Sequence, residues 1–211
     1  MIKENKKKRG LNTTIILLFI LFTLFILFTL LDRNFIAYQN ILQVFNNLSY
    51  VAIIAAPLTM IFILGEIDIS FGAVMALSSM LVGNLYKAGV DIRIAIVVAI
   101  IAGAAVGAVN GFFVAKIGIN SIIVTLGTML IGTGAAYMLS EGLGRSIPVY
   151  DNTIGMLGRG GIKLFTASSG KTFYIPWPII MVIVIYVFFW FVLKKTSLGQ
   201  HIYAIGQNRR A

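Results

Sequence analysis

The sequence predicts an all-α, polytopic membrane helical bundle: one domain over residues 1–211, six transmembrane helices, and both chain ends on the cytoplasmic side. Hydrophobic residues make up 59% of the chain and charged residues only 11%, against roughly 25% charged in an average soluble domain. Six apolar runs approach or reach the roughly 20 residues that a spanning helix needs. If these runs alternate across the bilayer, ten of the 17 basic residues fall on one side, and that side is the cytoplasm.

The first two spans are expected at residues 11–31 and 48–64. The first follows a basic tail and ends at Asp32-Arg33-Asn34, which favours a retained helix over a cleaved signal peptide. Between the two spans, residues 35–45 place aromatic and aliphatic side chains at helical spacing, which is typical of a short amphipathic helix on the outer interface. Pro57 lies inside the second span and is expected to kink it.

The remaining spans are expected at residues 69–86, 94–115, 121–139 and 175–193. In the fourth span Gly103, Gly107 and Gly111 are four residues apart and form a small-residue face, which favours close helix packing over ligand binding. The polar segment 141–174 is interpreted as an ordered or partly ordered external loop.

A polar break separates the second and third spans at Gly65, Glu66, Asp68 and Gly72. An acid costs roughly 2.5–3.5 kcal/mol at the centre of a membrane helix on insertion scales, so two acids here need a reason. They could cap the free amides at the start of the next helix, because Asp68 and Ser70 are good N-cap residue types. They could equally line a gate or a pathway, and both interpretations remain open.

Enzyme chemistry is not expected, and neither is a catalytic residue, a cofactor or a metal site. The chain has no cysteine, and its one histidine, His201, lies in the C-terminal segment, so no Ser-His or Cys-His pair can form inside the membrane. No stretch matches the Walker glycine-lysine loop. The basic residues lie in tails and loops rather than in a groove with aromatics, so no nucleic-acid partner is expected.

The C-terminal segment 196–211 is the second informative stretch. It could be a basic juxtamembrane segment that contacts anionic lipid headgroups. However, its two glycines and the apolar residues between 202 and 205 favour a short structured element that docks a partner.

Four stretches of the sequence resemble the permease subunits of ribose-type ABC importers, a branch that also includes autoinducer-2 importers. Residues 65–72 are similar to the Gly-Ile-Asp-Leu-Ser-x-Gly pattern of that family, although Glu66 departs from it. Further resemblance lies in residues 107–111, in Thr125-Leu126-Gly127-Thr128, and in the segment 199–208.

The resemblance implies a permease subunit of an ATP-driven importer for a ribose-like sugar, as a multi-pass protein of the bacterial inner membrane. It implies three protein partners: a cytoplasmic ABC ATPase, an extracytoplasmic sugar-binding protein and a second permease copy. The ATPase-coupling segment would include Tyr203, Ala204, Gly206, Asn208 and Arg209. Family members continue beyond this segment, so the chain is expected to be the N-terminal portion of the family fold.

Candidates for a substrate pathway are polar residues within or next to the spans: Asp68, Ser70, Ser78, Asn84, Asn110, Thr125 and Thr128. Two other functions stay open. One is a non-transporting scaffold or regulatory subunit. The other is a channel or secondary transporter with Glu66 and Asp68 as ion ligands, although no inverted-repeat partner of the acidic cluster is visible.

Overall fold

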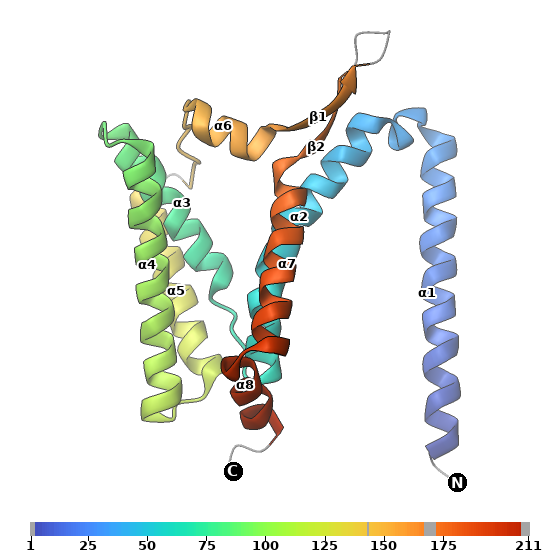
Figure 1. Ribbon diagram of the computed structural model, residues 1–211, viewed down its shortest axis with the longest axis horizontal. Coiled ribbons are helices and arrows are strands. Elements are labelled where there is room, and N and C mark those ends of the chain that lie inside the picture. Colours follow the sequence, from blue (N-terminus) through green and yellow to red (C-terminus); the bar gives the residue numbers. More distant parts are fainter. Residues whose placement is uncertain (1–2, 143, 167–171, 208–211) are drawn as a thin grey trace. The chain divides into compact units, whose positions relative to one another are not determined.

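The computed structural model describes residues 3–142, 144–166 and 172–207 (Figure 1). By its internal contacts the chain divides into two units, Met1–Leu48 and Ser49–Ala211.

The first unit contains helix α1 (Lys3–Leu31), a 3₁₀ turn (Arg33–Ile36) and the beginning of helix α2 (Tyr38–Ile63). Asp32 begins the turn, and its Oδ1 accepts a hydrogen bond from the Asn34 N–H at 2.9 Å. The Phe35 ring then packs against Phe25 and Phe28 of α1, with centroids 5.6 and 5.7 Å apart. These contacts hold the turn against the end of α1.

Helix α2 differs from the expectation at its start. A separate interfacial helix over 35–45 and a span from residue 48 were expected, but one continuous helix covers both. Neither glycine nor proline separates the two segments, so nothing in the backbone ends the first one. Pro57 lies inside the helix, which nevertheless continues to Ile63.

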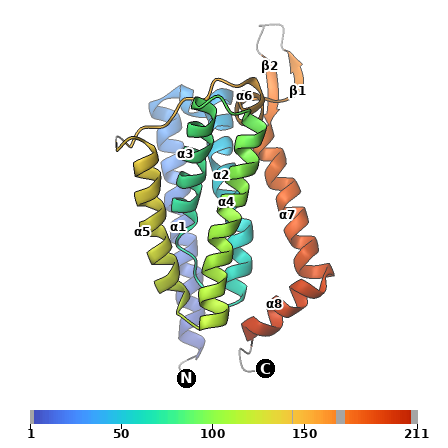
Figure 2. The same cartoon turned by 90° about the vertical axis from the view of Figure 1, so that its left-hand side faces the viewer.

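The second unit is built around helices α3 (Phe71–Lys87), α4 (Ile92–Phe112) and α5 (Ser121–Leu139), which lie side by side in Figures 1 and 2. Helix α3 packs most extensively against α5 and then against α4. Apart from Ile92, their buried apolar residues are small, for example Ala73, Ala95 and Ala136. Without a hydrophobic driving force between helices in lipid, such small residues let the helices approach closely.

Helices α3 and α5 run in the same direction and are joined at both ends. Just before α3, the Ile67 N–H donates to the Oγ of Ser121, the first residue of α5, at 3.3 Å. Near the other end, the Asn84 Nδ2 donates to the Leu139 carbonyl at 2.9 Å. The segment from Ile67 to the end of α3 therefore covers the same length as α5.

Two helices of this unit end in the same closure, in which a glycine adopts a left-handed conformation. At the end of α2, Gly65 has φ +78°, its N–H donates to Phe62, and the Glu66 N–H donates to Ile61. At the end of α3, Gly89 has φ +84°. This is the Schellman motif, which satisfies the last carbonyls of a helix and favours glycine at the left-handed position.

A π-helical turn (Phe113–Ile117) joins α4 to α5 and ends at Gly118, which has φ +82°. The segment after α5 contains helix α6 (Asn152–Arg159) and an antiparallel hairpin of strands β1 (Gly161–Thr166) and β2 (Thr172–Pro176). Helix α7 (Trp177–Lys195) follows, and the short helix α8 (Ser197–Gln207) follows it (Figure 1).

The hairpin corrects the expectation of an all-α fold. Its strands are rich in β-branched and aromatic residues, and the Phe165 and Phe173 rings stack with centroids 4.7 Å apart. The fold is therefore mostly helical, with one two-stranded sheet in a segment that was expected to be a loop.

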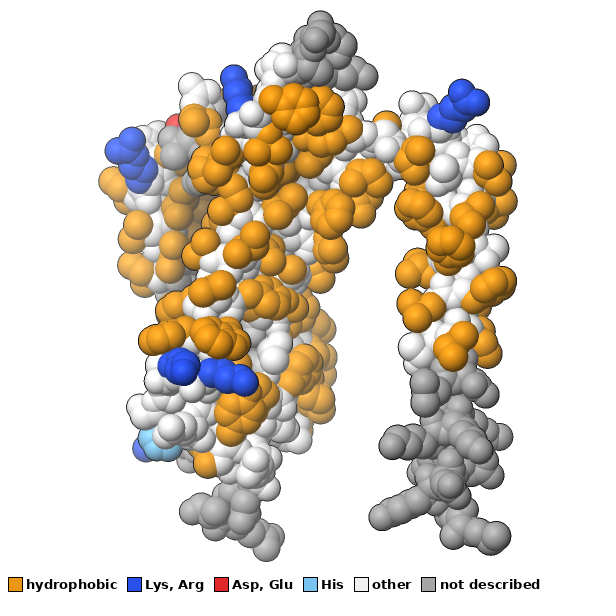
Figure 3. Space-filling model, turned by 45° about the vertical axis from the view of Figure 1, so that its right-hand side comes forward, with side chains coloured by type: hydrophobic (Ala, Val, Ile, Leu, Met, Phe, Trp, Pro, Cys, Tyr) orange, Lys and Arg blue, Asp and Glu red, His pale blue; other side chains and the backbone are white. Residues whose placement is uncertain are grey.

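Five helices among the described residues are long and apolar enough to cross a membrane: Thr13–Leu31, Tyr38–Ile63, Ile92–Ile117, Ser121–Leu139 and Trp177–Lys195. Their surfaces are largely hydrophobic, as the orange side chains along the helices in Figure 3 show. The expected third span is the helix α3, whose 17 residues leave it outside this group of five.

Candidate functional site

The polar break becomes an irregular segment between the end of α2 and Phe71, the first residue of α3. Asp68 lies in this segment, and its Oδ1 accepts hydrogen bonds from both the N–H and the hydroxyl of Ser70, each at 2.7 Å. Asp68 thus bonds the amide of Ser70, the residue before α3, while Ser70 makes no side-chain cap bond of its own. Gly72 lies in the first turn of α3 with open space around it.

A chain of four polar side chains runs from this break into the helix cluster. Ser70, which donates to Asp68, accepts a hydrogen bond from the Asn110 Nδ2 of α4 at 3.2 Å. The Asn110 Oδ1 in turn accepts a hydrogen bond from the Thr128 hydroxyl of α5 at 2.5 Å. Ser70 is 1% exposed and Asn110 is 7% exposed. We refer to Asp68, Ser70, Asn110 and Thr128 as the polar chain.

The polar chain joins the start of α3 to α4 and α5 through side-chain hydrogen bonds. Buried polar groups normally need such partners, because an unsatisfied donor or acceptor costs about 1–3 kcal/mol. The arrangement fixes the irregular segment against two helices that are long and apolar enough to span a membrane.

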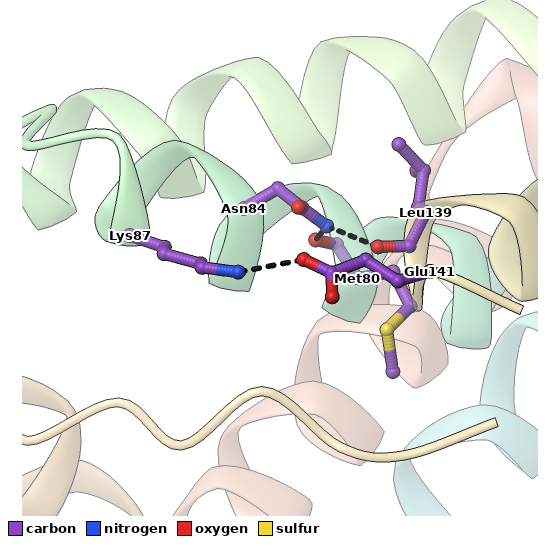
Figure 4. Close-up of polar contacts among 5 residues, drawn as sticks. All are labelled: Met80, Asn84, Lys87, Leu139 and Glu141. Atoms are coloured by element: carbon purple, nitrogen blue, oxygen red, sulfur yellow. Dashed lines mark hydrogen bonds and ion pairs between the residues drawn. The ribbon is translucent and has the colours of Figure 1, made fainter. Parts of the chain in front are cut away.

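The other three pathway candidates lie outside the polar chain. The Thr125 hydroxyl donates to the Ser121 carbonyl at 2.8 Å, one turn earlier on the same helix. Asn84 lies near the other end of α3, where its Nδ2 donates to the carbonyls of Met80 and Leu139, both at 2.9 Å (Figure 4). Ser78, also on α3, lies 3.6 Å from where a Cβ on Gly103 would stand.

An ion pair lies close to Asn84, as Figure 4 shows. The Lys87 Nζ is 2.7 Å from the Glu141 Oε1, and both side chains are well exposed. The hydrogen bond from Lys87 and its charge lower the pKa of Glu141 below the usual 4.5. These two residues also line a hollow of about 370 Å³, together with Tyr86, Ser140, Arg145 and Ile147 among others.

The three packing glycines of α4 have different surroundings. A Cβ on Gly103 would contact Ser78 and Val74 of α3 at 3.6 Å, whereas Gly107 and Gly111 have open space within the described part of the chain. A tighter glycine contact lies on α5, in a run of the fifth span whose glycines and threonines predict tight packing: a Cβ on Gly132 would stand 3.3 Å from the Ala73 Cβ of α3.

Ser121 is a further residue that the sequence did not single out as part of a site. It is 6% exposed and accepts from the Ile67 N–H, which ties the break to the start of α5. Its only signal in the sequence is its position at the first residue of an expected span, which is a common place for serine.

The expected coupling segment is the helix α8. The Thr196 Oγ1 accepts from the Gly199 N–H at 3.3 Å and thereby caps the start of the helix. Gly199 and Ile202 are buried, whereas Tyr203 is 42% exposed and Ala204 is exposed. Gly206 lies against the backbone at the end of α2. Asn208 and Arg209 lie outside the described residues.

No group of three or more potential metal ligands occurs in the described part of the chain. The geometry supplies a partly buried hydrogen-bonded chain in an apolar helix cluster. It also places the short amphipathic helix α8 next to the end of α2, where the break begins.

Comparison with known proteins identifies the family. The sequence profile described as "Branched-chain amino acid transport system / permease component" matches residues 40–211. The chain belongs to this permease family. The match begins in α2 and covers the break, the polar chain and α8.

Among similar curated proteins are the autoinducer 2 import system permease proteins LsrD of Yersinia enterocolitica, Salmonella typhimurium and Yersinia pestis (strain Pestoides F). They are 35%, 34% and 33% identical over 162 residues, which is 76% of this chain and 46% of each relative. The chain therefore spans about half the length of these relatives. No solved structure matches.

Proposed function

We propose that the chain forms part of the transmembrane permease subunit of an ATP-driven importer in a bacterial inner membrane. The observation that carries this proposal is the family match over residues 40–211, which includes every residue of the polar chain and of α8. A separate ABC ATPase would hydrolyse ATP, because the sequence contains no Walker loop.

The proposed cargo is a small hydroxylated molecule, either a ribose-like sugar or autoinducer-2. The 33–35% identity to LsrD proteins supports this class, whereas the family description names branched-chain amino acids. Hydroxylated molecules are recognised by a few converging hydrogen-bonding groups. We propose that the polar chain and, near the other end of α3, Asn84 lie along the pathway of this molecule, with Thr125 beside it.

The proposed topology has six crossings with both chain ends in the cytoplasm. What supports the sixth crossing is the pairing of α3 with α5, which are hydrogen-bonded at both ends and run in the same direction. If α5 crosses the bilayer, the segment from Ile67 to Lys87 has the length to cross beside it. The break at 64–70 then lies in the cytoplasmic half, on the same side as α8.

The proposed partners are the ATPase, which docks on α8, an extracytoplasmic sugar-binding protein, and a second permease copy. Exposed side chains on α8, such as Tyr203 and Ala204, support a docking role for this helix. Burial of Gly199 and Ile202 on its other side supports a fixed orientation.

The experiment that tests this function is reconstitution of the chain in nanodiscs with the candidate ATPase and binding protein from the same genome. We expect ATP hydrolysis to rise on addition of ribose or autoinducer-2 with the binding protein, and not with leucine. ATPase binding without stimulated hydrolysis would favour the scaffold or regulatory alternative. Substrate flux driven by an ion gradient without ATP would favour a secondary transporter.

A further inference from the structure

One glycine of α8 lies against the end of α2 too closely for any other residue. A Cβ on Gly206 would collide with the carbonyl oxygen of Ile63 and would stand 2.9 Å from the carbonyl carbon and 3.6 Å from the Leu64 Cα. The obstacle is backbone, so a change of side-chain rotamer cannot relieve the collision. Any substitution at position 206 must therefore move α8 away from α2.

The geometry of α2 explains why the Ile63 carbonyl faces α8. The Schellman closure uses the carbonyls of Ile61 and Phe62. In a continuing helix the Ile67 N–H would bond to Ile63, but here it donates to Ser121. The carbonyl at the end of α2 is thus directed at Gly206, where the absence of a side chain permits close contact.

The contact residues of α8 lie on one helical face. Gly199, Ile202 and Gly206 are three and four residues apart, which places them along one side of a helix. A Cβ on Gly199 would likewise collide with the carbonyl oxygens of Val192 and Leu193 near the end of α7. This inner face holds α8 between the ends of α7 and α2, and leaves Tyr203 exposed.

Only a few residues separate this contact from the polar chain. Ile67, four residues after Ile63, bonds to the start of α5, and Asp68 follows directly. We propose that Gly206 is a positioning residue that seats α8 on the end of α2, so that a displacement of α8 moves the 64–70 break and the polar chain. In this role Gly206 acts inside the permease and does not contact the ATPase. The link to transport rests on the proposed function, but the contact between Gly206 and the end of α2 does not.

The chain contains no cysteine, so a single introduced cysteine can report on the break. The reporter is Ile67→Cys, because the Ile67 side chain is 41% exposed. Its labelling rate with a maleimide is measured in the chain alone, in nanodiscs, with and without Gly206→Ala. The matched controls are Gly111→Ala, which has open space around it, and Ala204→Ser on the exposed face of α8.

We expect Gly206→Ala to change the labelling rate about threefold or more through local opening of the break, while the two controls leave it unchanged. An unchanged rate in a folded Gly206→Ala protein would overturn the proposal. If that variant does not fold, the link is tested from the other end, with Gln207→Cys as the reporter on α8 and Ser121→Ala as the change. Thr125→Val is the control, because among the described residues the Thr125 hydroxyl bonds only within α5. An unchanged Gln207→Cys rate in Ser121→Ala would also overturn the proposal.

The assembled importer separates this inference from the proposed function. We expect Gly206→Ala to retain ATPase binding but to lose substrate-stimulated hydrolysis, and Tyr203→Ala to weaken binding. Loss of ATPase binding in Gly206→Ala with normal Ile67→Cys labelling would show that Gly206 contacts the ATPase. That result would contradict the proposal that Gly206 positions α8 on the end of α2. If Gly206→Ala changes the Ile67→Cys labelling rate but no ATPase binds the unaltered chain, the proposed function fails, while the positioning role of Gly206 is retained.

Discussion

At the scale of single residues, Asn110 is the centre of the polar chain, because its side chain bonds both to Ser70, just before α3, and to Thr128 of α5. Its amide donates to Ser70 and accepts from Thr128. The sequence predicted that Asn110 could bond across helices, but it could not name the two partners, which lie 40 and 18 residues away along the chain. Such pairs depend on how the helices pack, and no local pattern records that.

We expect Asn110→Ala to lower the free energy of unfolding by about 1–3 kcal/mol, because it removes the acceptor of the half-buried Thr128 hydroxyl and one of the two hydrogen bonds of the buried Ser70 hydroxyl. The measurement is unfolding in detergent, followed by circular dichroism. A double-mutant cycle of Asn110→Ala with Thr128→Val should give a coupling of about 0.6–1.7 kcal/mol, the range found for hydrogen bonds in membranes. Additive effects would show that the pair does not interact.

Glu141 gives a prediction for pH. Lys87 lowers its pKa, so its folded pKa lies below the unfolded one. The ion pair is therefore fully formed above the unfolded pKa and is lost as the pH falls through the lower folded pKa. We expect the carboxyl ¹³C shift of Glu141 to titrate below pH 4.5, the usual value, and Lys87→Met to move the midpoint upward. An unchanged midpoint in Lys87→Met would contradict the assigned cause. Because both side chains are exposed, little effect on stability is expected.

At the scale of elements, the end of α2 depends on one glycine. Gly65 has φ +78°, a conformation that costs other L-residues roughly 1–2 kcal/mol. We expect Gly65→Ala to lower the free energy of unfolding by about 1 kcal/mol. Gly72→Ala is the matched control, because Gly72 lies in the first turn of α3 with open space and no positive φ. Equal losses in the two variants would argue against the Schellman closure.

Close packing of α3 on α5 gives a second prediction for an element. A Cβ on Gly132 would already stand 3.3 Å from the Ala73 Cβ, whereas Gly134 has open space. We expect Gly132→Leu to destabilise the chain by about 1–3 kcal/mol through overpacking and Gly134→Leu to change it little. The measurement is the same detergent unfolding. A larger loss in Gly134→Leu would show that α5 presents a different face to α3.

Long apolar helices were the elements best predicted from the sequence. The fifth span was expected at 121–139 and α5 is Ser121–Leu139, because Asn120 caps the start of the helix and neither a charged residue nor a proline interrupts the run up to Ser140. The hairpin after α6 was not predicted, since strands β1 and β2 are short and their pairing is a tertiary contact. Fusion of the expected 35–45 helix into α2 was also missed, because the change from an amphipathic to an apolar pattern does not itself interrupt a helix.

At the scale of the whole molecule, the topology depends on whether α3 crosses the bilayer. At about 1.5 Å per residue, its 17 residues cover about 25 Å of a hydrocarbon core about 30 Å thick. Five crossings would place the two chain ends on opposite sides, and six would place them on the same side. The hydrogen bonds that align the Ile67–Lys87 segment with α5 favour six.

Because the chain lacks cysteine, single cysteines can decide the number of crossings in intact cells. We expect Asn34→Cys and Ser146→Cys to react with a membrane-impermeant maleimide, since the proposed six-span topology places both segments on the outer face. Asn5→Cys and Gln200→Cys should react only after the membrane is permeabilised. Reaction of Gln200→Cys but not Asn5→Cys in intact cells would place the ends on opposite sides. In that case α8 would lie outside, where no cytoplasmic ATPase can reach it, and the importer proposal would fail with the six-span topology.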